Sequence, residues 1–237
     1  MSQELVILSV TAATIGLVHT VLGPDHYLPF VVLARARRWS KTKTAGITTL
    51  CGLGHVGSSV FLGTIGIALG VAVSRLEWIE STRGDVAAWL LTAFGLVYMV
   101  WGIRRAVRSK PHSHVHAHAG GEVHIHDHTH QESHVHPHDQ LSTARTLTPW
   151  VLFTIFVFGP CEPLIPILMY PAAAESTAGI VIVATAFGAT TIATMLAMVL
   201  VLSFGLEQLP TRGLERYSHA LAGLAIMLCG VAIHLGL

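Results

Sequence analysis

Charged residues are scarce in this sequence. Asp, Glu, Lys and Arg together make up 11% of the 237 residues, whereas soluble domains carry roughly 25%. This shortage excludes an ordinary cytosolic enzyme, a disordered protein and a nucleic-acid-binding protein. The formal net charge of +1 also provides no basic field to attract a polyanion. Because 52% of the residues are hydrophobic, we expect an integral protein of the lipid bilayer.

Cysteines are also few. Cys51, Cys161 and Cys229 lie in apolar runs and share no disulfide-type spacing. They therefore say little about the redox compartment. The sequence has no ATP-binding signature and no His-Glu-x-x-His element. We therefore expect neither an enzyme nor a prosthetic group. Any energy that the protein uses would come from an ion gradient, the membrane potential or a partner.

Six segments are long enough to cross a bilayer, which takes about 20 mostly apolar residues. They are Leu5–Ala34, Ala45–Val73, Val86–Ile103, Thr148–Ala174, Ala178–Leu206 and His219–Leu237. The first segment has no basic leading region and no small-residue cleavage site, so we expect it to be retained rather than removed as a signal peptide. The sequence predicts an all-α integral membrane protein with six transmembrane helices.

Basic residues are concentrated in alternate connections. The connections after the first, third and fifth segments hold 12 Lys and Arg residues, whereas the other side has only Arg75 and Arg83. Cytoplasmic loops are enriched in Lys and Arg. We therefore expect a prokaryotic inner (cytoplasmic) membrane, with both termini outside and the 12 basic residues in the cytoplasm.

The two halves of the chain resemble each other. Three pairs of motifs recur in the same order: Gly23-Pro24-Asp25-His26 with Gly159-Pro160-Cys161-Glu162, Gly54-His55-Val56-Gly57-Ser58 with Gly188-Ala189-Thr190-Thr191, and Gly95, Met99 and Gly102 with Gly223, Met227 and Gly230. The glycines alone are also consistent with ordinary packing of small residues between helices. An odd number of spans per repeat makes the second copy enter from the opposite side. We therefore predict two inverted three-helix repeats, 1–108 and 147–237, separated by 109–146.

The Gly-Pro elements lie near the middle of the first and fourth segments. Proline removes a backbone donor and glycine loosens a helix, so we expect both helices to break there. Irregular backbone at membrane depth is tolerated where it is buried in protein or lines a watery cavity. The sequence therefore predicts a functional site near the membrane midplane.

Asp25 and Glu162 are the only acidic residues well inside the six segments, which contain no Lys or Arg to neutralise them. A carboxylate at the bilayer centre is costly. We expect either a bound cation or, alternatively, a protonated, hydrogen-bonded carboxyl group at each break.

Histidines near these breaks suggest which cation would bind. His19, His26 and His55 offer imidazoles, and Cys161 is either a ligand or a small apolar filler. Imidazole with carboxylate suits Ni, Co, Zn or Fe. His19 and His26 can reach one ion only if the helix unwinds at Gly23-Pro24. A single buried histidine is otherwise explained by a structural hydrogen bond.

The segment between the two halves is rich in histidine. Its histidines are His112, His114, His116, His118, His124, His126, His128, His130, His134, His136 and His138. The segment has almost no apolar residues, so we expect a disordered cytoplasmic loop. Imidazoles at this density favour metal capture, the alternative being a solvated linker.

His19-Thr20-Val21-Leu22-Gly23-Pro24-Asp25-His26, Leu53-Gly54-His55 and the histidine-rich loop resemble the nickel/cobalt transporter superfamily, which includes permeases, efflux proteins and urease-accessory-type membrane proteins. Five residues separate His19 from the Asp25-His26 pair, one more than in the permease signature. The resemblance implies transport of Ni²⁺ or Co²⁺, with Zn²⁺ or another divalent metal as further candidates. It also implies that His19, Asp25, His26 and His55 are pathway ligands. A cytoplasmic metallochaperone is then an expected partner.

Two other classes remain open. Membrane thiol–disulfide electron carriers use paired cysteines on Pro-containing first and fourth helices, but Asp25 occupies the position equivalent to Cys161. A related solute exporter would require cationic groups in the spans, and the predicted spans contain no Lys or Arg. An intramembrane metallohydrolase would use the same histidines to hold a catalytic zinc.

Overall fold

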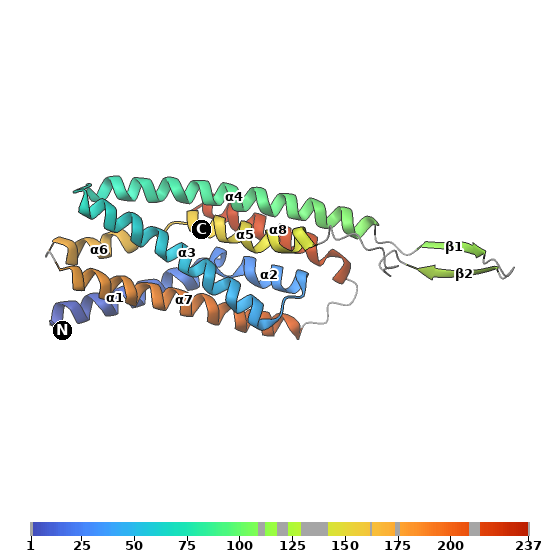
Figure 1. Ribbon diagram of the computed structural model, residues 1–237, viewed down its shortest axis with the longest axis horizontal. Coiled ribbons are helices and arrows are strands. Elements are labelled where there is room, and N and C mark those ends of the chain that lie inside the picture. Colours follow the sequence, from blue (N-terminus) through green and yellow to red (C-terminus); the bar gives the residue numbers. More distant parts are fainter. Residues whose placement is uncertain are drawn as a thin grey trace.

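The computed structural model describes residues 2–108, 112–117, 123–128, 142–161, 163–173, 176–208 and 214–236. Its helices run side by side in an elongated bundle (Figure 1). Five helical segments in these ranges are long and apolar enough to cross a membrane: α1 (Gln3–Leu22), α3 (Lys41–Ala68), α4 (Val73–Arg108), α7 (Thr177–Glu207) and Glu215–His234, which joins the 3₁₀ turn η2 (Glu215–Tyr217) to α8 (Ser218–His234). The expectation of a helical, multi-pass membrane protein is confirmed.

The first and fourth predicted spans are both interrupted at their Gly-Pro elements. The first consists of α1, the 3₁₀ turn η1 (Pro24–His26) and α2 (Leu28–Arg37). The fourth consists of α5 (Ser142–Phe158) and α6 (Leu164–Ala173). Gly23 ends α1 by donating its N–H to the carbonyl of His19, and Pro24 has no N–H with which to continue the ladder. Each interrupted segment therefore places irregular backbone inside the bundle.

Helix α4 begins 13 residues before the predicted span, at Val73 rather than Val86. Its buried face continues from Gly95 back through Leu91, Ala88 and Gly84 to Glu80. The hydropathy of this first part is low because it contains charged residues. Helical periodicity nevertheless places Glu80 on the buried face.

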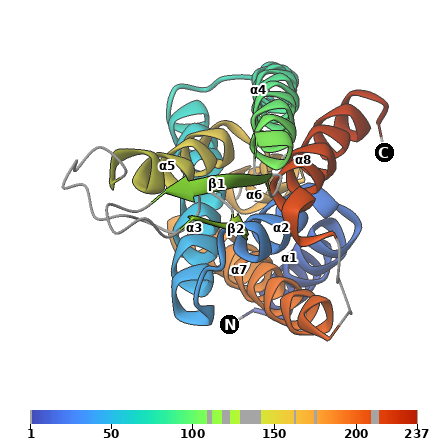
Figure 2. The ribbon, with the colours of Figure 1, turned by 90° about the vertical axis from the view of Figure 1, so that its right-hand side faces the viewer.

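Helices α4 and α8 pack closely through glycines. A Cβ atom on Gly95 would overlap the backbone of Met227, and one on Gly223 would overlap the backbone of Met99. The two contacts are reciprocal, because Gly95 corresponds to Gly223, and Met99 to Met227, in the sequence repeat. Helix α1 likewise packs along α7, and α3 along α5 (Figure 2).

Two clusters of buried apolar side chains form the core of the bundle. One contains Phe30, Phe156 and Ile226, and the other contains Leu164 and Phe187. Large apolar side chains are also exposed along the outside of the helices, as expected of a surface in contact with lipid: Val10, Leu53, Phe61, Trp89 and Val201.

The histidine-rich segment has regular structure where we expected none. Strands β1 (His112–Ala117) and β2 (Val123–His128) pair antiparallel, with His114 opposite His126 and His116 opposite His124. Histidine alternates with other residues in both strands, and this period of two suits a strand. His118, His130, His134, His136 and His138 lie outside the described residues.

Candidate functional site

Three histidines meet at the break in the first span. His19 lies in the last turn of α1, His26 ends η1, and His55 lies in the middle of α3. The ring centroids of His19 and His26 are 4.6 Å apart, and those of His26 and His55 are 5.0 Å apart. One ring nitrogen from each lies within 4.8 Å of those of the other two. The interruption at Gly23-Pro24 thus brings together residues that a continuous helix would separate.

The break fixes the orientation of His26. Its Nδ1 atom lies 3.2 Å from the carbonyl oxygen of Gly23 and 3.3 Å from Oδ1 of Asp25. A Cβ atom on residue 23 would lie only 2.6 Å from this nitrogen, so the ring position requires glycine there. The side chain of Asp25 is 30% exposed, whereas that of His26 is buried. Asp25 therefore interacts with His26 at the edge of the buried cluster.

Cys161 belongs to the same cluster. Its Sγ atom lies 2.9 Å from Nε2 of His55, and both side chains are buried. Gly159, two residues earlier, packs against the other side of this ring: a Cβ atom there would lie 3.0 Å from Nδ1 of His55. The break between α5 and α6 therefore contacts the imidazole with both a thiol and a glycine.

A buried ion pair supports Cys161, and the sequence analysis missed it. Arg83 is paired with Glu80 on α4, and Glu80 is fully buried. The backbone N–H of Cys161 lies 3.2 Å from both Oε2 of Glu80 and Oγ of Ser59. Arg83 also donates to Oγ of Ser58 at 2.7 Å and to the carbonyl oxygen of Val157 at 2.8 Å. Helix α4 is thereby attached to α3 and to the end of α5.

This pair corrects two expectations. Glu80, outside the six predicted segments, is a buried acidic residue of the bundle, and Arg83 provides a cationic side chain beside the site. Both errors follow from starting the third span at Val86, which left Glu80 and Arg83 in a loop. The i,i+3 spacing of the two charges on a continuous buried helix face is the signal that identifies them.

Each of the three imidazoles has a buried nitrogen with no hydrogen-bond partner among the described residues. These atoms are Nε2 of His19, Nε2 of His26 and Nδ1 of His55. Buried polar atoms are nearly always hydrogen-bonded. Nε2 of His19 and Nε2 of His26 are therefore available to a ligand, whereas His55 also lies close to the backbone of Phe156.

One further predicted site residue, Glu162, is outside the described residues. Cys51 and Cys229 are free and buried, and both pack in the apolar cluster that contains Phe30. Cys229, on α8, also lies close enough to Asp25 for the two side chains to interact electrostatically.

The fold and the site define a multi-pass membrane protein with a thiol–imidazole pair at a helix break. The sequence profile of the cytochrome c biogenesis protein transmembrane region matches residues 28–232, and the chain belongs to this family. Searches of curated proteins and of solved structures give no match. The resemblance to the nickel/cobalt transporter superfamily is therefore wrong, and so is the inference of Ni²⁺ or Co²⁺ transport. Short histidine motifs led to that error, whereas the family match extends over most of the chain.

Proposed function

We propose that this protein is a membrane thiol–disulfide electron carrier in which Cys161 is the exchanging thiol. The observation that carries the proposal is the 2.9 Å contact between Sγ of Cys161 and Nε2 of His55. A thiolate, rather than a thiol, is the nucleophile in exchange, and an adjacent imidazole that accepts the thiol proton generates it. Membership in the cytochrome c biogenesis transmembrane family supports this chemistry.

Exchange at one cysteine proceeds through mixed disulfides. The Cys161 thiol gives its proton to His55, and the thiolate attacks a disulfide of an acceptor protein. A Cys161–acceptor bond forms, the acceptor bond breaks, and the released sulfur takes up a proton. A thiolate of a donor dithiol protein then attacks Cys161 and releases the second acceptor thiol. The second donor thiolate closes the donor disulfide and releases Cys161, so two electrons and two protons have passed from donor to acceptor.

The single cysteine at this site determines which sulfur completes the cycle. Asp25 occupies the position in the first half that corresponds to Cys161 in the second. Position 25 therefore supplies no second thiol, and in this scheme the resolving thiol comes from the donor protein. Because Cys161 is fully buried, exchange also requires the bundle to open first toward the acceptor on one side and then toward the donor on the other.

We also infer six membrane passes arranged as two inverted repeats. The reciprocal contacts of Gly95 and Gly223 support this arrangement. Helix α1 packs against α7, and α3 packs against α5. A repeat that relates the first span to the fourth and the second span to the fifth would exchange these two pairs, so they also support the arrangement. The basic ends of α2 and α4 lie together at the end of the bundle nearest β1 and β2 (Figure 1). We place that end in the cytoplasm.

The test uses the full-length protein in liposomes, with a reduced dithiol protein outside and a disulfide-bonded protein enclosed. We expect Cys161→Ser to abolish reduction of the enclosed disulfide and trapping of a mixed disulfide after acid quenching. Cys51→Ser, a change at a buried cysteine in the apolar cluster, is the matched control and should retain transfer. Wild-type transfer by the Cys161→Ser variant, or no transfer by the wild type, would overturn the proposal.

The histidine cluster favours a second candidate activity, the binding of one resident transition-metal ion. One ring nitrogen from each of His19, His26 and His55 lies within 4.8 Å of the other two, and imidazole nitrogens are ligands of the kind found in zinc sites. The Nδ1 atom of His26 is held by Asp25 and by the carbonyl of Gly23, the arrangement that orients histidines bound to metals. This candidate concerns binding only, not passage of metal through the protein.

Cobalt is a suitable probe because its absorption reports coordination by nitrogen. The full-length chain, with the histidines of residues 112–138 replaced by asparagine, should bind one Co²⁺ ion. His26→Asn should abolish that absorption. His234→Asn, a change at the end of α8 where the imidazole packs against Trp89, should leave it unchanged. Equal absorption in the His26→Asn variant would rule out the site.

A further inference from the structure

A second region, at the end of the bundle, has a strongly basic cavity. This cavity of about 970 Å³ lies where α2 and α4 end and where α3 and α8 begin. The ionisable side chains of its lining are mostly basic: Arg37, Arg38, Lys43, Arg105 and Arg216, with Glu215 and His219 as the others. Five cationic side chains around one carboxylate give the cavity an affinity for anions.

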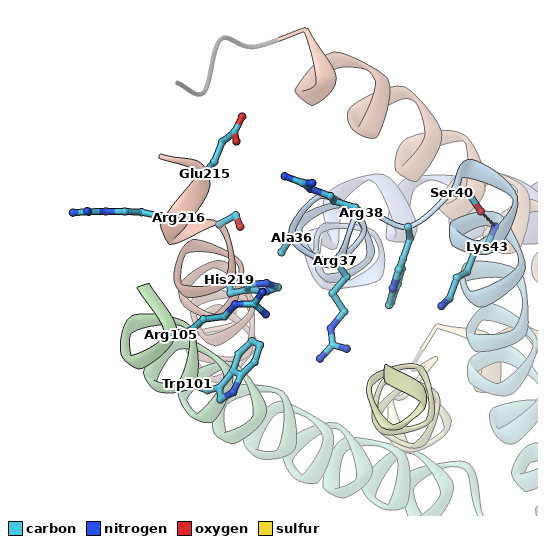
Figure 3. A pocket seen from close by; sticks show the side chains of 12 residues that line it. Ala36, Arg37, Arg38, Ser40, Lys43, Trp101, Arg105, Glu215, Arg216 and His219 are labelled. Atoms are coloured by element: carbon cyan, nitrogen blue, oxygen red, sulfur yellow. Dashed lines mark hydrogen bonds between the residues drawn. The ribbon is translucent and has the colours of Figure 1, made fainter. Parts of the chain in front are cut away.

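Two of the arginines come from different helices and point into the cavity. The side chains of Arg37 and Arg105 both extend into it, whereas Arg216 points away (Figure 3). Nε of Arg37 donates to the hydroxyl of Tyr98 at 3.2 Å, and this hydroxyl lies 2.8 Å from Nδ1 of His219. The guanidinium of Arg105 lies 5.5 Å from the ring centre of Trp101. Aromatic side chains thus hold both guanidinium groups in place.

An apolar cavity adjoins the basic one. It has a volume of about 830 Å³, and the two cavities share Ala36, Arg38, Trp39, Glu215 and Ser218. Most of its wall is formed by apolar side chains of α2, α7 and α8, which include Val31, Val32, Leu200, Leu206 and Leu221. Its charged lining residues are Arg35, Arg38, Lys41, Glu207 and Glu215. A charged compartment and an apolar compartment therefore meet at Trp39.

We infer that these two cavities together bind one anionic phospholipid. Its phosphate would lie between Arg37 and Arg105, since guanidinium groups match phosphate oxygens with paired hydrogen bonds. An acyl chain would occupy the apolar cavity against Val32 and Leu221. The position at the helix ends is where lipid headgroups meet a membrane-spanning bundle, and basic pockets between such helices suit anionic headgroups. A free inorganic anion would use the basic compartment alone and leave the apolar one unexplained.

The first experiment measures lipid binding to the purified full-length protein in detergent. Phosphatidylglycerol should bind roughly tenfold or more tightly than phosphatidylcholine, and Arg37→Gln with Arg105→Gln should remove that preference. The matched control is Arg75→Gln, an exposed arginine at the opposite end of α4, which should retain it. Equal loss of preference in the control would show general attraction to positive charge and overturn the inference.

The second experiment places the acyl chain. Phosphatidylglycerol with brominated acyl chains should quench tryptophan fluorescence in a saturable phase that disappears in the Trp39→Phe variant. Trp78→Phe, an exposed tryptophan near the start of α4, should keep that phase. Glycerol 3-phosphate should not displace the lipid at equal concentration. Displacement by this soluble headgroup, or quenching independent of Trp39, would identify an anion site without lipid and contradict the inference.

Discussion

The Sγ atom of Cys161 contacts Nε2 of His55 at 2.9 Å, although 106 positions separate the two residues in the chain. His55 belongs to the first half of the chain and Cys161 to the second. The contact therefore spans the junction between the two halves. Any movement of one half against the other changes this distance and with it the access of the imidazole to the thiol proton.

Gly159→Ala tests the dependence of exchange on this contact. The added methyl group would lie 3.0 Å from Nδ1 of His55, closer than side-chain carbons normally approach, so the ring must shift by a few tenths of an ångström. We expect the rate of mixed-disulfide formation at Cys161 to fall roughly tenfold, because small displacements of reacting groups are costly. The measurement is acid-quenched trapping in the reconstituted protein.

The control is Gly57→Ala, which adds the same methyl group two residues after His55. No atom lies within 4 Å of that position, and alanine favours a helix. This variant should exchange at the wild-type rate. An unchanged rate in Gly159→Ala as well would mean that His55 has no part in exchange.

The pair formed by Glu80 and Arg83 is expected to show strong coupling in stability. Glu80 is fully buried and the side chain of Arg83 is only 18% exposed. Removing one partner leaves an uncompensated charge, so Glu80→Gln alone should lower the free energy of unfolding by about 3–5 kcal/mol. The Glu80→Gln, Arg83→Gln double variant should be less destabilised than the sum of the two single changes. Denaturant unfolding in detergent measures the cycle, and simple additivity would contradict the coupling.

Much of the fold could be predicted from hydropathy. The predicted spans Ala45–Val73 and Ala178–Leu206 lie within a few residues of α3 and α7, and the Gly-Pro elements mark the two breaks. The start of α4 could not be found in this way. Its charged residues lower the hydropathy, and their burial depends on partners from α3 and α5 that are distant in the sequence.

The candidate site could be predicted only in part. The spacing of His19 and His26 indicated that they meet only where the helix unwinds, and the structure brings them together with His55. The orientation of Cys161 toward His55 depends on how the two halves pack, which no local motif encodes. The family was misassigned for a related reason. The assignment was based on a motif of eight residues, His19 to His26, whereas the family match depends on the sequence pattern of residues 28–232.

Gly223→Ala should destabilise the contact between α4 and α8. A methyl group at this position would overlap the backbone of Met99, and backbone cannot move aside as a flexible side chain can. We expect a loss of about 1–3 kcal/mol in the free energy of unfolding. Gly205→Ala, with no atom within 4 Å, should leave stability unchanged or raise it by less than about 1 kcal/mol. Equal stability of the two variants would show that close approach at Gly223 is not required.

Asp25→Asn separates the role of the carboxylate from that of the imidazoles in metal binding. Oδ1 of Asp25 lies 3.3 Å from Nδ1 of His26 and orients the ring without contributing a nitrogen to the cluster. Loss of such a supporting group typically costs 10- to 100-fold in metal affinity, so roughly that decrease is expected for Co²⁺. The absorption spectrum of bound Co²⁺ should keep its shape, since the same three nitrogens remain. A changed spectrum would place Asp25 among the direct ligands. An unchanged affinity would mean that the carbonyl of Gly23 alone is enough to orient His26.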